Sequence, residues 1–263
     1  MDILTSLSEA EGWKASITAF ALIYGAVVTV LIIVLVIVGL FFEIMNSRRP
    51  ERWIQKDRRN RRKWKELTHA PGPIAVIAFC VSRGIFAQLQ GWTITPLTLS
   101  CWSVPLSPGI SIVLYDAWFY RIHRLLHWRP MYRFHALNHK SVAPSVWTNH
   151  YESLTEAFLN QAFYIIVPFI PPIPWQIMLV QKLYDQVSGM LGHAGFDHFA
   201  SLAGRSPFPL ASKVFHNRHH RHFRYNYGFT FSWWDRLIGT IHPTYDETLA
   251  SFEPGTKVLP ATK

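Results

Sequence analysis

The histidines of this sequence recur at spacings that suit metal binding. His123 and His127 lie four residues apart, and His135 and His139 repeat that spacing. Residues four apart on a helix differ by about 40° in direction, so both imidazoles of such a pair can reach one metal ion. A later run has three more histidines at i, i+3 and i+4, which we expect to share one helical face: His216, His219 and His220.

An eighth histidine, His193, stands in a Gly-His-Ala-Gly sequence at the end of an apolar segment. Neutral imidazole suits iron, zinc, copper and nickel. Eight histidines exceed the need of one tetrahedral zinc site, so we expect two metal ions with about four or more imidazoles each. Two irons can activate O2, which side chains alone cannot do. Asp116 precedes His123 by seven residues and is expected to hydrogen-bond the second nitrogen of a ligating imidazole.

Long apolar segments predict that these histidines belong to an all-α, integral-membrane helix bundle. Residues 17–42 contain no charge over 26 positions, whereas a membrane span needs about 20. Weaker apolar segments follow at 74–92, at 97–120, which two prolines interrupt, and at 157–191, which three prolines divide. We expect about four or five transmembrane or re-entrant helices and a cytosolic, helical, histidine-rich cap.

A basic segment directly follows the first predicted span. Residues 48–65 hold 10 of the 26 lysines and arginines, in a chain of net charge +10. Such a cluster marks the cytoplasmic side of a membrane, and the predicted hairpins return the histidines to that side. No groove-reading motif accompanies it, so nucleic acid is not an expected partner. The two cysteines, Cys80 and Cys101, have no CxxC spacing and are not expected to bind metal.

Two other functions would also use clustered histidines. A membrane haem-binding electron carrier would place them in the middle of spans on facing helices, whereas here they lie near span ends. A metal transporter or sensor would need polar residues through the membrane interior, and these spans are mostly apolar. A structural role would suit one isolated pair better than three ordered clusters.

The ordered histidine motifs resemble those of the fatty acid hydroxylase/sterol desaturase superfamily. That family has an HxxxH, an HxxHH and a final HxxHH among membrane helices, and the first and last look like His123–His127 and His216–His220. Asn226–Gly228 and Trp234–Thr240 resemble the family's closing segment, and Gly192–Gly195 resembles a further element. The similarity covers roughly residues 105–245, the predicted catalytic domain, between membrane helices at 1–104 and a C-terminal tail at 246–263.

The resemblance implies an oxidoreductase: a membrane-bound di-iron oxygenase that hydroxylates or desaturates a sterol, fatty acyl or related lipid. It implies two iron ions, O2 as co-substrate, and electrons from a separate donor such as cytochrome b5 or a ferredoxin with its reductase. Such an enzyme is expected in the endoplasmic reticulum of a eukaryote or the inner membrane of a bacterium, with a cytoplasmic active site. By position, it implies these iron ligands: His123, His127, His135, His139, His193, His216, His219 and His220.

Two positions depart from the family pattern. Asn138 stands where the middle motif commonly has a histidine, and its carbonyl is a poorer iron ligand than imidazole. Either one metal has a weaker contact there or another residue substitutes. The candidate substitutes are His150, His198 and Asp197. Residues 153–156 read S-L-T-E where sterol-type members often have H-P-x-E, so Glu156 matches and Ser153 and Leu154 do not.

Overall fold

The computed structural model describes residues 12–253, and this range is helical, with two isolated β-bridges and no strand. The long helices are α2 (Trp13–Arg48), α4 (Pro71–Leu89), α5 (Ser103–Leu126) and α9 (Trp175–Gly192). The shorter ones are α3 (Lys63–Leu67), α6 (Tyr132–His135), α7 (Leu154–Gln161), α8 (Phe163–Ile166), α10 (Lys213–His222), α11 (Trp233–Ile238) and α12 (Tyr245–Ala250). The all-α prediction is therefore confirmed for the described residues.

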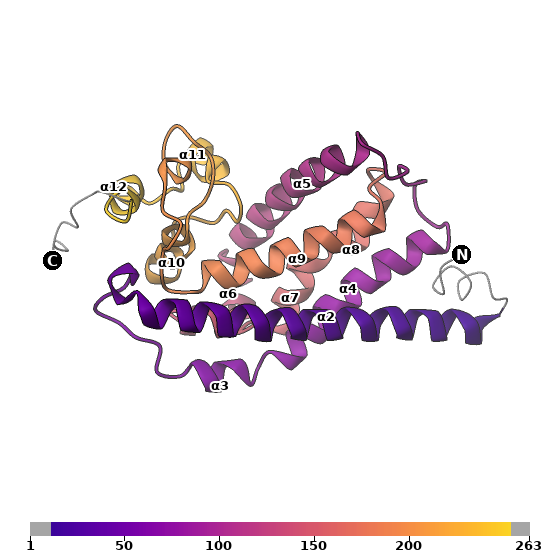
Figure 1. Ribbon diagram of the computed structural model, residues 1–263, viewed down its shortest axis with the longest axis horizontal. Coiled ribbons are helices and arrows are strands. Elements are labelled where there is room, and N and C mark those ends of the chain that lie inside the picture. The colour runs from indigo at the N-terminus through magenta and orange to yellow at the C-terminus, as the bar shows by residue number, and fades with distance from the viewer. Residues whose placement is uncertain (1–11, 254–263) are drawn as a thin grey trace.

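Helix α2 runs along the length of the bundle (Figure 1) and buries one narrow stripe. Ala19, Ile23, Val27, Leu31 and Leu35 recur every four residues and are at most 6% exposed, while apolar side chains on its other faces lie outward. Both α2 and α4 are long and apolar enough to cross a membrane. No other helix among the described residues meets that criterion, so the expected four or five transmembrane or re-entrant helices remain a prediction.

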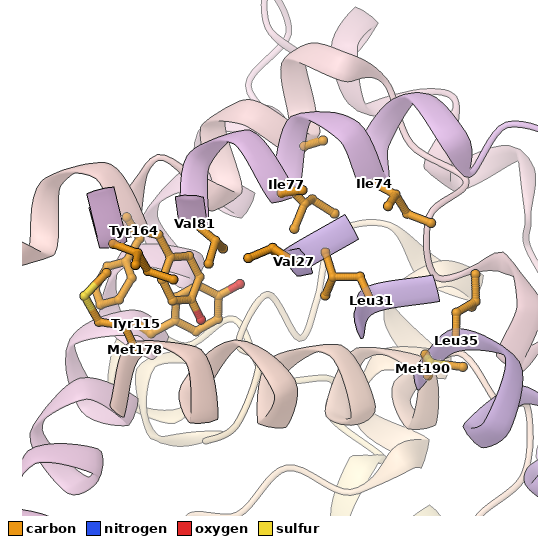
Figure 2. Close-up of a cluster of buried hydrophobic side chains, with 14 of the residues drawn as sticks. Val27, Leu31, Leu35, Ile74, Ile77, Val81, Tyr115, Tyr164, Met178 and Met190 are labelled. Atoms are coloured by element: carbon orange, nitrogen blue, oxygen red, sulfur yellow. The ribbon is translucent and has the colours of Figure 1, made fainter. Parts of the chain in front are cut away.

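The core lies where α2, α4, α5, α8 and α9 meet. Figure 2 shows Val27 and Leu31 of α2 near Ile77 of α4, with Met190 of α9 below them. Helix α4 approaches α8 so closely that a Cβ at Gly84 would lie 2.1 Å from the carbonyl oxygen of a residue in α8. The core thus joins helices on both sides of the predicted boundary at residue 104.

Prolines shape the bundle differently from one segment to another. Helix α5 continues through Pro105 and Pro108, so the predicted interruption there is wrong. Pro105 lies in the first turn, where its missing N–H needs no partner, and Pro108 removes one further hydrogen bond without ending the helix. By contrast, the prolines at 171–174 do separate α8 from α9, as the sequence predicted.

Helices α10, α11 and α12 gather at one end of the bundle, near the end of α2 (Figure 1). Phe215 of α10 packs against Tyr245 and Leu249 of α12 in a small second core, so the first residues of the predicted tail are folded. Residues 254–263 of that tail lie outside the described range. The basic segment lies at the same end, because Ile54 N–H donates to the carbonyl of Gly195 at 3.0 Å. Its predicted proximity to the histidine segments is therefore confirmed.

Candidate metal centre

Five histidines, here called the five-histidine group, point at one another from α5, α10 and the segment between α5 and α7. The group consists of His123, His127, His135, His139 and His219, whose ligand nitrogens all lie within 4.8 Å of one another. The Nε2 atoms of His127, His139 and His219 are 3.1–3.2 Å apart. Nε2 of His123 and Nε2 of His135 are 3.2 Å apart. Each ring therefore presents the same nitrogen to a shared centre.

Three further histidines adjoin them and are called the three-histidine group: His193, His216 and His220. Their Nε2 atoms are 3.1–3.4 Å apart. The ring centroids of His139 and His220 are 5.2 Å apart, and those of His216 and His219 are 5.7 Å apart. The arrangement suits two neighbouring metal ions.

The opposite ring nitrogens show why a metal fits here. Nδ1 of His123 contacts the carbonyl of Tyr227 at 2.8 Å, and Nδ1 of His219 contacts that of Tyr225 at 2.7 Å. His193 contacts the carbonyl one turn earlier in α9 at 2.9 Å. A neutral imidazole has one proton, so with it on Nδ1 the Nε2 atom carries only a lone pair. Lone pairs that converge in this way are stabilised by a cation between them.

Burial keeps these imidazoles in the neutral form that binds metal. It lowers the pKa of His123 and of His193 to about 4, and that of His127 to about 3. Burial, and then the charge that neighbouring rings would carry, holds the pKa of His219 and His220 well below its usual range. The groups therefore need no deprotonation at neutral pH before they bind a cation.

Two of the orienting carbonyls belong to a loop at residues 225–233, which buried carboxylates hold in place. Asp235 accepts hydrogen bonds from the backbone N–H of Tyr227 at 2.9 Å and of Gly228 at 2.8 Å. A Cβ at Gly228 would lie 2.4 Å from a backbone oxygen, so glycine is required there. Asn226 adopts a left-handed φ of 60°, a conformation in which asparagine is enriched.

Asp116 holds the same loop and does not contact a histidine. Its carboxylate accepts from the backbone N–H of Thr230 at 2.7 Å and of Phe231 at 3.1 Å, and from the indole N–H of Trp233 at 3.3 Å. The predicted hydrogen bond to a ligating imidazole is therefore wrong. Asp116 lies about two turns before His123 on α5. At that position its carboxylate contacts the 225–233 loop and not the histidines.

His135 takes its orientation from a carboxylate that the sequence did not assign to it. Its Nδ1 lies 2.6 Å from Oε1 of Glu156, and Asn138 donates to the same oxygen at 3.1 Å. Ser153 caps α7 by accepting from the backbone N–H of Glu156 at 3.1 Å. Asn138 thus supports the partner of a histidine.

The proposed substitutes for the absent histidine at Asn138 lie outside both groups. His150 contacts a glutamine of α9 at 2.9 Å, and His198 contacts an asparagine of α2 at 2.8 Å. Asp197 accepts two backbone N–H groups at 3.0 and 3.3 Å. None of the three joins either histidine group in this structure, although His150 and Asp197 line the same cavity as His193, so a substitute for Asn138 stays a prediction.

The histidines are grouped in space differently from what their spacing in the sequence predicted. His135 ends α6, and a separate 3-10 turn carries His139, so these two do not share a helix. In α10, His216 and His220 join the three-histidine group while His219 joins the five-histidine group. The eight histidines thus form groups of five and three among the described residues, and the expected number of imidazoles per metal stays a prediction.

A cavity of about 470 Å³ borders the three-histidine group. His193 and His216 line it, together with Phe119 of α5 and Phe229 of the 225–233 loop. Within the described range, no member of the five-histidine group lines it. A metal with three protein ligands keeps positions for small molecules, so the three-histidine group is the one open to the cavity.

Sequence reasoning missed the carbonyls of Tyr225 and Tyr227 and the contact of Glu156 with His135. Every residue has a backbone carbonyl, so residue type does not show which carbonyl will orient an imidazole. The nearby sequence did offer a clue, because the glycine at 228 and the aspartate at 235 are the residue types that hold this loop.

Known proteins share this region of the chain. A family model described as fatty acid hydroxylase matches residues 109–240, which include both histidine groups. Methylsterol monooxygenase 1 of Gallus gallus is 34% identical over 135 residues, which cover 49% of this chain and 43% of that protein. A methylsterol monooxygenase of Aspergillus fumigatus is 29% identical over 163 residues, which cover 59% of this chain and 54% of that protein.

Human lathosterol oxidase is 32% identical over 127 residues, which cover 48% of this chain and 42% of that protein. The chain thus spans about half the length of the curated relatives it matches. No solved structure matches the chain.

Proposed function

The chain belongs to the fatty acid hydroxylase family, and on that premise we propose that it is an integral-membrane di-iron oxygenase that hydroxylates or desaturates a lipid C–H bond with O2. One observation carries the proposal: two adjoining groups of inward-facing Nε2 atoms, one of which borders a cavity. The relatives named as sterol oxidases favour a sterol or related lipid as substrate.

The donor set favours iron over zinc. Five imidazoles exceed the four ligands of a tetrahedral zinc site, and neutral nitrogen donors also suit iron. The five-histidine group would hold one iron and the three-histidine group the other. When bound, the two irons would supply the reductive activation of O2.

The chain itself would orient the ligands and hold the lipid. Backbone carbonyls at Tyr225 and Tyr227 keep the protons of two imidazoles on Nδ1, so that Nε2 faces the metal. Ile77, Phe119 and Phe229 line the cavity and would exclude water from the reacting carbon. Which hydrogen is removed then depends on how the cavity presents the substrate, because displacements of about 1 Å alter such reactions greatly.

Electrons would come from a separate donor, such as cytochrome b5 or a ferredoxin with its reductase. The basic segment supports an acidic donor, because it lies beside the histidine groups and its Arg58, Arg59, Arg61 and Arg62 are exposed. Reversing the charge of Arg58 and Arg59 to glutamate should slow reduction by the donor and weaken its dependence on salt. Unchanged rates and salt dependence would contradict this docking surface.

We also propose that the histidine end of the bundle faces the cytoplasm, in the endoplasmic reticulum of a eukaryote or the inner membrane of a bacterium. The support is the basic segment that follows α2 at this end. In a Cys101→Ser background, needed because Cys101 is itself exposed, an Arg59→Cys variant should react with a membrane-impermeant thiol reagent from the cytoplasmic side. Labelling from the opposite side alone would contradict the orientation.

The activity can be tested with purified, iron-loaded protein in lipid vesicles, a chemical or protein reductant, and ¹⁸O2. Mass spectrometry should detect either one ¹⁸O atom in a lipid product or the loss of two hydrogens. His216→Ala should abolish both, because His216 lies in the three-histidine group and lines the cavity. The matched control is His222→Ala, at the end of α10 and in neither group. Equal product from the two variants would contradict the proposal.

A further inference from the structure

The cavity also contains buried polar side chains that the histidine groups do not use. These residues, here called the inner polar end, come from α7 and α9 and line the cavity: Asn160, Gln161, Lys182, Asp185 and Gln186. All five are at most 9% exposed. A buried lysine and aspartate inside an apolar helix bundle are costly, so such groups usually have a function.

Helix α9 fixes the distance between this end and the metal centre. Lys182, Gln186 and His193 lie on one face of α9, because spacings of four and seven residues return to nearly the same direction. At 1.5 Å per residue, Gln186 lies about 10 Å and Lys182 about 16 Å along the axis from His193. The cavity thus has a histidine end and a polar end at a set separation.

The inner polar end retains unused hydrogen-bonding capacity. Oδ1 of Asn160 and Oε1 of Gln186 are buried and accept no hydrogen bond from any described residue. Nζ of Lys182 donates to Oε1 of Gln161 at 2.9 Å, which uses one of its three N–H groups. A hydroxyl group both donates and accepts. It can therefore accept from the ammonium and donate to a free amide oxygen.

The charges nearby disfavour a carboxylate as the ligand. Asp185 and Glu152 both lie close enough to Lys182 to interact with its ammonium. Asp185 is itself held by the hydroxyl of Tyr164 and by Gln181, which donates at 2.6 Å. An incoming carboxylate would have to share one lysine with two acidic side chains, whereas a neutral hydroxyl needs no charged partner of its own.

We propose that the inner polar end binds a hydroxyl group of the lipid substrate and so selects the carbon that reaches the three-histidine group. This inference rests on the proposed function and narrows its substrate class to a neutral lipid alcohol. Because Gln186 and Lys182 lie about 10 and 16 Å along α9 from His193, the hydroxyl would be held away from the histidine end of the cavity. Lys182 and Gln186 are then specificity-determining residues for the reaction.

Equilibrium binding to the full chain in detergent tests this without turnover. The probes are two matched pairs, hexadecan-1-ol with hexadecane and cholesterol with 5α-cholestane, and hexadecanoate as the anionic comparison. In at least one pair the alcohol should bind roughly tenfold or more tightly than its hydrocarbon, as expected for a hydrogen bond to a charged group. Hexadecanoate should bind less tightly than hexadecan-1-ol.

Three variants assign the preference to the site. Gln186→Met and Lys182→Met should each reduce the preference for the alcohol while leaving hydrocarbon affinity unchanged. Gln176→Met makes the same chemical change at an exposed position of α9 and should retain the preference. Gln186→Met keeps the test valid if Lys182→Met unfolds through the loss of a partner for Asp185.

Equal affinity within both pairs would overturn the proposal, as would a preference that survives in Gln186→Met and a folded Lys182→Met. Tighter binding of hexadecanoate than of hexadecan-1-ol would overturn it too. Because no reductant or O2 is used, a failure here is distinct from a failure of the oxygenase proposal, which the ¹⁸O experiment reports.

Discussion

We expect Asp235 to support the candidate metal centre through the 225–233 loop, and Asp235→Asn tests this. The side chain is fully buried and touches no histidine nitrogen in the described structure. Its oxygens accept from Tyr227 N–H at 2.9 Å, Gly228 N–H at 2.8 Å and the Thr240 hydroxyl at 2.6 Å. The carbonyl of Tyr227 in turn contacts Nδ1 of His123 at 2.8 Å.

The magnitude follows from counting donors. Asparagine keeps one acceptor oxygen but places an NH2 group against a backbone N–H, so at least one hydrogen bond to a charged acceptor is lost. That loss should lower the free energy of unfolding by about 1.5–3 kcal/mol. The carbonyl of Tyr227 would then hold His123 less firmly, and loss of such a supporting contact typically lowers metal affinity by about 10–100-fold.

Metal affinity should be measured by competition with a chelator, and stability by thermal unfolding in detergent. The matched control is Asp246→Asn, which alters a carboxylate that is 40% exposed and pairs with Arg236. That change should cost about 1 kcal/mol or less and leave metal affinity unchanged. Wild-type metal affinity in Asp235→Asn would refute the proposed link between the loop and His123.

Low pH, substitutions of two helical glycines and a substitution of Asn138 should also have measurable effects. Because burial lowers the pKa of His123 and of His193 to about 4, the unfolded chain binds more protons between about pH 6.5 and 4. The metal-free protein should therefore lose stability as pH falls through that window in thermal unfolding, and a flat profile would contradict the buried neutral histidines. Gly84→Ala should destabilise by about 1–3 kcal/mol because its Cβ meets a carbonyl at 2.1 Å. Gly25→Ala, which meets nothing within 4 Å, should be neutral or stabilising by up to about 1 kcal/mol in the same assay. Asn138→Ala should keep the full metal content by elemental analysis, because the amide of Asn138 donates to Glu156 at 3.1 Å and so supports a ligand's partner; loss of one metal would make it a ligand.

The sequence predicted that the eight histidines would gather, but not how they divide between the two groups. Imidazoles four residues apart on α5 do meet, because a helix fixes their direction. The segment that carries His135 and His139 is not one helix, so its spacing did not determine its geometry. The transfer of His219 to the five-histidine group depends on tertiary packing around α10, which no local spacing describes.

Polar contacts across the fold were also beyond local reasoning. Asp116 was placed correctly on the face of α5 that carries His123, but the 225–233 loop, more than 100 residues later, occupies its carboxylate. Prolines were equally ambiguous. Pro108 stays inside α5, whereas the prolines at 171–174 separate two helices, and the neighbouring packing decides between these outcomes.

We propose above all that this chain holds two coupled irons. This proposal is tested most directly by elemental analysis and Mössbauer spectroscopy of detergent-purified protein from cells grown on ⁵⁷Fe. We expect about two irons per chain in a magnetically coupled state, with the coupling lost in His219→Ala, because His219 belongs to the five-histidine group and stacks on His216 of the three-histidine group. A metal-free protein, or one that holds a single zinc after growth in excess iron, would contradict it.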